Sequence, residues 1–102
     1  MPVCTATKCN YHYHNNAVID SYDVKKIKEI AVAAAKRGAE EFSIKCTSEA
    51  VYREAFDKLC RDSIDCYAVI KEASKANKKI VQTGYRYAPD ETMRVITIYF
   101  KF

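Results

Sequence analysis

The sequence predicts an α+β two-layer sandwich, in which helices cover one face of a four-stranded, mostly antiparallel sheet that ends in a C-terminal hairpin. Two observations lead to this class. Residues 79–102 are rich in Ile, Val, Thr, Tyr and Phe on both sides of a short turn, which is typical of a β-hairpin. Before them, stretches with helical hydrophobic spacing alternate with short β-like stretches. The expected order is β-α-β-α-α-β-β in a single domain of residues 1–102.

The predicted hairpin joins residues 80–87 to residues 93–102 through a turn at residues 88–91. Pro89 presets φ for the first central position of a type I turn, and Asp90 suits the second. This closure fixes the register of the two strands. It turns one set of side chains toward the core: Val81, Thr83, Tyr85, Tyr87, Ile96, Ile98 and Phe100.

The first helix is predicted over residues 22–37, where apolar residues recur at intervals of three and four. Asp20 or Ser21 is the expected N-cap. Gly38 is the expected residue just after the helix, because glycine accepts the left-handed conformation that ends many helices. A short strand over residues 39–46 follows, with alternating apolar and polar positions.

A second helical stretch begins after the capping residues 47–49 and keeps helical spacing as far as Asn77. Unbroken, it would be about 45 Å long, which exceeds the width of a compact domain of this size. Residues 62–65 offer side chains that compete with the helical hydrogen bonds. The sequence therefore predicts a break there and a third helix from about Ser63 to Asn77.

Residues 2–13 alternate loosely with period two and are expected to form the first strand. The N-terminal segment also carries four potential zinc ligands, Cys4, Cys9, His12 and His14. In an extended strand, Cys4 and His14 would lie roughly 33 Å apart. This separation argues against a zinc site, although whether the four residues ever bind metal is left open. No other cofactor is expected.

Composition narrows the classes of function. The chain has 102 residues, five cysteines and a formal charge of +4. An odd number of cysteines at irregular spacing argues against a disulfide framework, so buried thiols are expected. No leader peptide or membrane span is visible, which predicts a soluble, cytoplasmic protein without membrane association. Lys and Arg are dispersed along the sequence, whereas nucleic-acid-binding domains usually gather them on one face.

Catalysis is not expected. The two glycines, Gly38 and Gly84, are isolated, so the chain has no phosphate-binding loop. A Cys-His nucleophile needs a thiol whose pKa is lowered by a helix N-terminus or a cation, and Cys46 is the only cysteine that directly precedes a predicted helix. No local motif supports such a site, and the carboxylate pairs of the chain fall at predicted turns and caps.

Aromatic and cationic side chains gather on the predicted hairpin. The candidate binding residues are Tyr85, Arg86, Tyr87, Arg94, Tyr99 and Lys101. Tyr and Arg are enriched in the hot spots of protein interfaces. The main expectation is therefore a small protein-binding domain, of the adaptor or mobile-element-encoded inhibitor type, that captures an unidentified partner on its sheet face or hairpin edge. An exposed final strand could also pair with a second copy to form a homodimer. The alternative is nucleic-acid binding through Tyr85, Arg86, Tyr87, Arg94 and Lys101, since outward aromatic side chains on a sheet can stack bases.

Residues 27–102 also resemble the small α/β segment that precedes the transglutaminase-like domain of some Gram-positive proteins. The matching pieces are a helix, the strand EEFSIKC, the helix around VYREAFDKLCRDSID, and the closing stretches GYRYAPDE and ITIYF. The catalytic Cys-His-Asp domain of those proteins has no counterpart here, and the stretch CTATKCNYHYH is an addition. The resemblance implies an accessory module that contacts a substrate or partner, and it carries over no catalytic residue.

Overall fold

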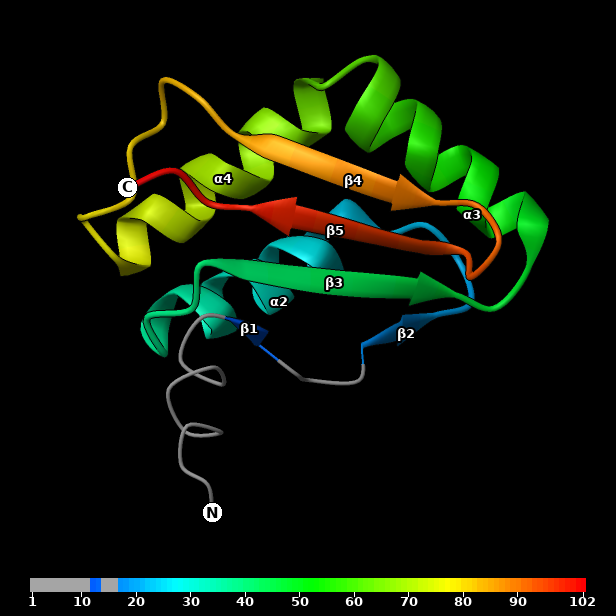
Figure 1. Cartoon of the computed structure of the whole chain (residues 1–102), viewed down its shortest axis with the longest axis horizontal. Coiled ribbons are helices and arrows are strands. Elements are labelled where there is room, and N and C mark those ends of the chain that lie inside the picture. The colour runs from blue at the N-terminus through cyan, green and yellow to red at the C-terminus, as the bar shows by residue number, and fades with distance from the viewer. Residues whose placement is uncertain (1–11, 14–16) are drawn as a thin grey trace.

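A computed structural model describes residues 12–13 and 17–102, and in it helices cover one face of a mixed β-sheet (Figure 1). The strands are β1 (His12–Tyr13), β2 (Val18–Ile19), β3 (Glu41–Cys46), β4 (Arg86–Asp90) and β5 (Val95–Tyr99). Their order across the sheet is β1-β3-β5-β4, and β2 also pairs with β3. β1 and β2 run parallel to β3, whereas β5 is antiparallel to both β3 and β4. The predicted α+β class, with its C-terminal hairpin, is confirmed.

The helix layer consists of α2 (Val24–Lys36), α3 (Glu49–Phe56), the π-helix η1 (Asp57–Arg61) and α4 (Ile64–Ala76). α2 and α4 lie side by side behind the sheet in Figure 1. The Tyr22 hydroxyl donates a hydrogen bond to Asp65 Oδ2 at 2.6 Å, next to the first residues of both helices. At the other end, Asn77 Nδ2 donates to the Ala35 carbonyl at 3.1 Å. The two helices therefore run in the same direction, with their C-terminal ends together.

The start of α2 differs from the prediction. Asp23 is the N-cap, with extended backbone and a carboxylate that accepts a hydrogen bond from the Lys25 N–H at 3.0 Å. Asp20 and Ser21 do not cap the helix, because β2 holds the preceding residues against β3 and the chain needs residues 20–23 to reach the helix layer. Gly38 follows the helix with a φ of +76°, as predicted.

The predicted break between the second and third helices is confirmed. α3 continues into the π-helix η1, and Ser63 then adopts a left-handed φ of 64° before α4 begins. The Ser63 hydroxyl donates to the Cys60 carbonyl at 3.2 Å, while the Tyr85 hydroxyl donates to the Ser63 carbonyl at 3.1 Å. Asn77 ends α4, as predicted.

The predicted position of the hairpin turn is wrong. Asp90 lies opposite Val95, so the loop comprises residues 91–94, while Pro89 lies inside β4. The Arg94 N–H donates to the Glu91 carbonyl at 3.2 Å, and Arg94 takes a left-handed φ of 54° to close the loop. The turn therefore forms three residues later than the sequence suggested.

Pro89 is tolerated in β4 because of the hydrogen-bonding pattern of β5. The Cys46 N–H donates to the Arg94 carbonyl, and the Phe100 N–H donates to the Glu40 carbonyl, so the even-numbered residues of β5 face β3. The odd-numbered residues face β4, which leaves Pro89 directed toward the open edge. At an edge, the missing N–H of proline removes no bond from the sheet.

The side of β5 that faces the helices was predicted correctly. Ile96, Ile98 and Phe100 are buried. The register differs from the expected one by an even number of residues, which preserves the face on which each side chain lies. Residues 80–85 form no strand, however, and Val81, Thr83 and Tyr87 are exposed, in contrast to the prediction. Of the four core-facing residues predicted in the first hairpin strand, only Tyr85 packs against the core.

The core lies between the sheet and the helices. Its fully buried side chains include Ile27, Ala31, Phe42, Ile44, Leu59, Val69, Ile70, Ile96 and Ile98. The final strand β5 is central, and the sheet ends at β4, so the exposed final strand proposed for dimer formation is wrong. Within residues 12–13 and 17–102, no helix combines the length and apolar character needed to cross a bilayer.

Candidate functional site

The sheet has one face that none of the described helices covers. The register of β3, β5 and β4 arranges the side chains of this open face in three rows: Glu41, Tyr99 and Arg86; Ser43, Thr97 and Ala88; Lys45, Val95 and Asp90. All nine are exposed or partly exposed. The middle row has the smallest side chains, and the Ser43 and Thr97 hydroxyls are hydrogen-bonded at 2.7 Å. The larger aromatic and cationic side chains lie in the outer rows.

Arg86 and Tyr99 form the most specific contact on the open face. They lie directly opposite each other in neighbouring strands, and the Arg86 guanidinium carbon lies 4.0 Å from the centre of the Tyr99 ring. A cation over an aromatic ring at this distance is attracted by the negative charge of the ring face. The guanidinium therefore covers one face of the ring, while the edge of the guanidinium keeps its N–H donors for a ligand.

A hollow of about 340 Å³ opens beside this contact. It is lined by Glu40, Gly84, Tyr85, Arg86, Tyr99, Phe100 and Lys101. A Cβ atom on Gly84 would lie 3.0 Å from Lys101 Cδ, so the absence of a side chain at Gly84 lets Lys101 cross the backbone there. The Lys101 carbonyl accepts a hydrogen bond from the Val81 N–H at 2.6 Å, which holds the C-terminal residues against the preceding loop.

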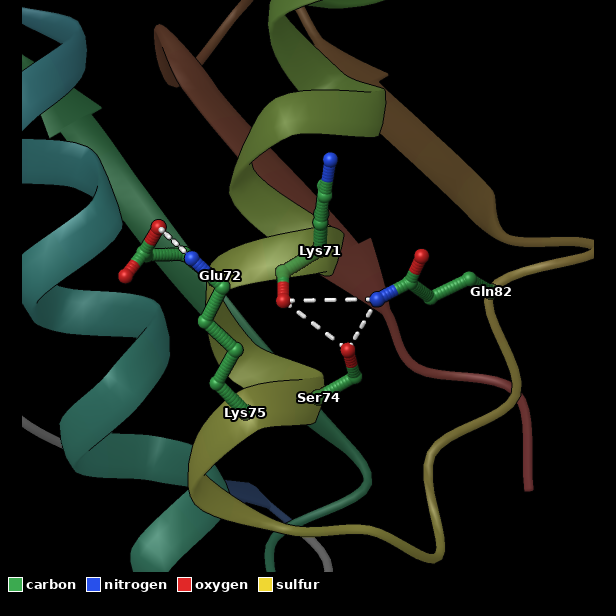
Figure 2. A network of polar contacts seen from close by, with 5 residues as sticks. All are labelled: Lys71, Glu72, Ser74, Lys75 and Gln82. Carbon is green, nitrogen blue, oxygen red and sulfur yellow. Dashed lines mark hydrogen bonds and ion pairs between the residues drawn. The ribbon is translucent and has the colours of Figure 1, made fainter.

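That loop is itself anchored to α4. Figure 2 shows Gln82 reaching toward the helix, where its Nε2 donates to the Lys71 carbonyl at 3.4 Å and to the Ser74 hydroxyl. The Ser74 hydroxyl also donates to the Lys71 carbonyl at 2.8 Å. These bonds fix residue 82 on the helix layer, and so they help to position Gly84 and Tyr85 at the hollow.

The hollow brings together four of the six predicted binding residues, Tyr85, Arg86, Tyr99 and Lys101. The other two lie elsewhere. Tyr87 is on the opposite side of β4, and Arg94 is in the hairpin loop, where its Nη1 donates to the Thr47 carbonyl at 3.2 Å.

Glu40, Gly84 and Phe100 line the hollow without having been predicted. The Glu40 carbonyl accepts a hydrogen bond from the Phe100 N–H at 2.8 Å, which continues the pairing of β3 with β5. Only that pairing brings the two residues together. The sequence identifies each of these strands, but no local pattern indicates which strand pairs with which.

The described thiols do not resemble catalytic cysteines. Cys46, Cys60 and Cys66 are buried. Burial raises the pKa of Cys60 to about 11 and that of Cys66 to about 12, and it also raises the pKa of Cys46, the residue that precedes α3. A nucleophilic thiolate requires the opposite shift.

Among residues 17–102, no group of three or more His, Cys, Asp or Glu side chains is placed to hold a metal ion. Cys4, Cys9 and His14 lie outside the described residues, and only the backbone of His12 is described. Whether these four residues bind metal therefore stays open.

Fold and site together define a small α+β sandwich whose open sheet face ends in an aromatic and cationic hollow. No protein-family model, no curated protein and no solved structure matches the chain. The resemblance to the segment that precedes transglutaminase-like domains stays a prediction.

Proposed function

We propose that this protein is a small, non-enzymatic binding domain that captures another protein on the open face of its sheet, as an adaptor or an inhibitor. The hollow at the end of that face carries the proposal. It presents the stacked side chains of Arg86 and Tyr99, two residue types that dominate the energetics of protein interfaces. A site of this composition on an otherwise polar sheet face suits an anchor side chain of a protein partner.

The charges around the hollow suggest the chemistry of that anchor. Arg86 and Lys101 contribute two cations, and Glu40 contributes one carboxylate. Because Arg86 stacks on Tyr99 through its face, its edge remains suited to a carboxylate of the partner, which a guanidinium binds with two parallel hydrogen bonds. We infer an acidic side chain next to an aromatic or aliphatic one as the recognised element.

The edge of β4 is less suited to binding than the face. Tyr87 and Pro89 direct their main-chain groups toward the open edge, and Pro89 has no N–H to donate. Proline on an edge strand is one of the devices that discourage pairing with another strand. We therefore favour binding on the sheet face over the formation of a homodimer along the edge of β4.

Nucleic-acid binding at the hairpin is also less favoured. Arg86 covers one face of the Tyr99 ring, and Tyr87 lies on the other side of β4. The aromatic side chains therefore do not form the outward row of free rings on which successive bases stack.

Selection from a random peptide library displayed on phage tests the protein-binding proposal. The immobilised target is the full chain, and peptides are measured by fluorescence anisotropy against Arg86→Glu/Lys101→Glu. A control variant, Arg53→Glu/Lys58→Glu, changes the charge equally at exposed positions of α3 and η1. We expect the selected peptides to contain an acidic residue beside an apolar one and to bind the control like the wild type.

The Arg86→Glu/Lys101→Glu variant should bind these peptides about 30-fold more weakly, the effect of losing one hot-spot contact. Equal binding to both double variants, or the recovery of no peptide that binds the wild type, would contradict the proposal. Circular dichroism and thermal unfolding show whether each variant keeps its fold.

A further inference from the structure

The excess positive charge of the chain lies on α2 and on the residues that directly follow α4. Residues 22–37 contain five cations and two carboxylates, and residues 64–79 contain four cations and two carboxylates. Together these segments carry a net charge of +5, whereas the whole chain carries +4 and the remainder therefore −1. Lys and Arg are dispersed in the sequence, but folding places α2 and α4 side by side and gathers most of them on the helix layer.

The C-terminal ends of the two helices concentrate this charge. The hydrogen bond from Asn77 to the Ala35 carbonyl joins these ends, and the cations around it are Lys36, Arg37, Lys75, Lys78 and Lys79, all of them exposed. Each helix C-terminus supplies only about half a negative charge. Among the described lysines of this surface, Lys75 alone forms an ion pair, with Glu72 at 3.5 Å. Figure 2 shows that pair on α4, on the side of the helix that faces α2.

A second hollow, of about 430 Å³, lies along α2. Its lining consists of Lys25, Lys28, Glu29, Val32, Ala33, Lys36 and Glu72. The three lysines, called the lysine row below, extend over eleven residue steps of one helix, or about 16 Å at 1.5 Å per residue. Val32 and Ala33 are small and leave room for a chain that runs along the row, while Glu29 and Glu72 reduce the net charge of the lining to +1.

We propose that the lysine row binds the sugar-phosphate backbone of a nucleic-acid duplex without reading its sequence. The three lysines can neutralise about three phosphates of one strand, and a row about 16 Å long is long enough to reach them. Lysine supplies compact, mobile cations suited to phosphate oxygens. No side chain of the hollow is aromatic or an arginine, so it offers no planar group that could stack on a base or bind guanine through two hydrogen bonds.

The composition of the hollow favours nucleic acid over a protein partner. Lys is depleted in protein interfaces, whereas Tyr and Arg are enriched there. The hollow on the helix face is lined by lysines, whereas the hollow on the sheet face is lined by tyrosines and an arginine. This inference is therefore independent of the protein-binding function proposed above, and it uses a different surface.

The test is a salt titration with a fluorescein-labelled DNA duplex of 20 base pairs as the probe, measured by anisotropy on the full chain. Three phosphate contacts, one for each lysine, predict a slope near −2.7 in the plot of log K against log salt, which is a loss of roughly 40-fold in affinity between 50 and 200 mM salt. The variant Lys25→Gln/Lys28→Gln/Lys36→Gln should lower the steepness of the slope by about 2.7. Gln has a helix propensity close to that of Lys, so α2 is retained.

Two controls make the result decisive. Arg86→Gln/Lys101→Gln changes the sheet face and should bind the duplex like the wild type, whereas the lysine-row variant should still bind the selected peptides. The proposal is overturned if the wild type does not bind the duplex at 50 mM salt, if the slope is flat, or if the lysine-row variant binds like the wild type. Binding to vesicles of phosphatidylserine without binding to the duplex would also overturn it and would assign the row to an anionic membrane.

Discussion

The two faces of the sheet are built from alternating residues of the same strands, yet their side chains differ in burial and in chemistry. On the covered face, Phe42, Ile44, Ile96 and Ile98 are fully buried beneath the helices. On the open face, every described residue of the three rows retains some exposure, and the charged and hydroxyl-bearing side chains are found there. Under the proposed function, this comparison separates residues that stabilise the fold from residues that bind the partner. A substitution on one face should alter the fold, whereas the neighbouring substitution on the other face should alter recognition.

The largest effect is expected from a truncation on the covered face. Ile98→Ala should lower the free energy of unfolding by about 2–5 kcal/mol, because it removes buried methyl groups and leaves a cavity beneath β5. A domain of this size has about 5–15 kcal/mol in total, so the variant should unfold at a clearly lower urea concentration. Urea denaturation followed by circular dichroism measures the change.

Val95→Ala is the matched control on the open face of the same strand. Val95 is half-buried and lies in the row with Lys45 and Asp90, so its truncation should cost less than about 1 kcal/mol. If both variants lost the same stability, the open face would be as much a part of the core as the covered one.

A smaller effect is expected at alkaline pH from the thiols on the helix side. The pKa of Cys60 and Cys66 rises from 9.0 in the unfolded chain to about 11 and about 12 in the folded protein, because burial disfavours the thiolate. The folded state therefore keeps protons that the unfolded state releases above pH 9. Stability should be complete below pH 9 and fall as the pH rises, by about 1 kcal/mol for each thiol between pH 8 and pH 10.

Comparing Cys60→Ala/Cys66→Ala with the wild type isolates this contribution. The double variant should show a flatter decline in the free energy of unfolding between pH 8 and pH 10, whatever its stability at neutral pH. Tyr22 contributes at still higher pH, because burial and the hydrogen bond to Asp65 raise its pKa as well. An unchanged pH dependence in the double variant would show that the thiols are exposed to water in the folded state.

The sequence predicted the covered side of β3 and β5 well because alternation is a local property. Period two in residues 41–46 identified Phe42, Ile44 and Cys46 as buried, and the same pattern identified Ile96 and Ile98 in β5. The helix break near Ser63 was also predictable, because both the length limit and the capping side chains are visible in the sequence. None of these inferences required knowledge of which strands are neighbours.

The misplaced turn shows where local reasoning stops. Pro89 suits both a turn and an edge strand, and the choice depends on whether its N–H side faces a neighbouring strand. The order β1-β3-β5-β4 makes β4 an edge, so proline is accepted there and the loop moves to residues 91–94. The strand β2 was missed because two residues, Val18 and Ile19, are too few to show a period.

The candidate site divides in the same way. Tyr85, Arg86, Tyr99 and Lys101 could be proposed from residue type alone, but their meeting in one hollow depends on the register of β4 and β5 and on Gly84 beneath Lys101. The concentration of lysines on the helix layer was not visible, because α2 and α4 are separated in the sequence by β3, α3 and η1. The concentration of lysines becomes visible only when the tertiary structure places the two helices side by side.

The smallest predicted effect concerns the hydrogen bond in the middle row of the open face. Ser43 and Thr97 are paired across β3 and β5, with their hydroxyls 2.7 Å apart and partly exposed to water. Ser43→Ala should lower the free energy of unfolding by about 0.5–1 kcal/mol, since water can replace the lost partner of Thr97. A double-mutant cycle with Thr97→Val measures the coupling between the two hydroxyls. A coupling above about 2 kcal/mol would mean that the bond is shielded from water, and the open face would then have to be covered by another part of the chain.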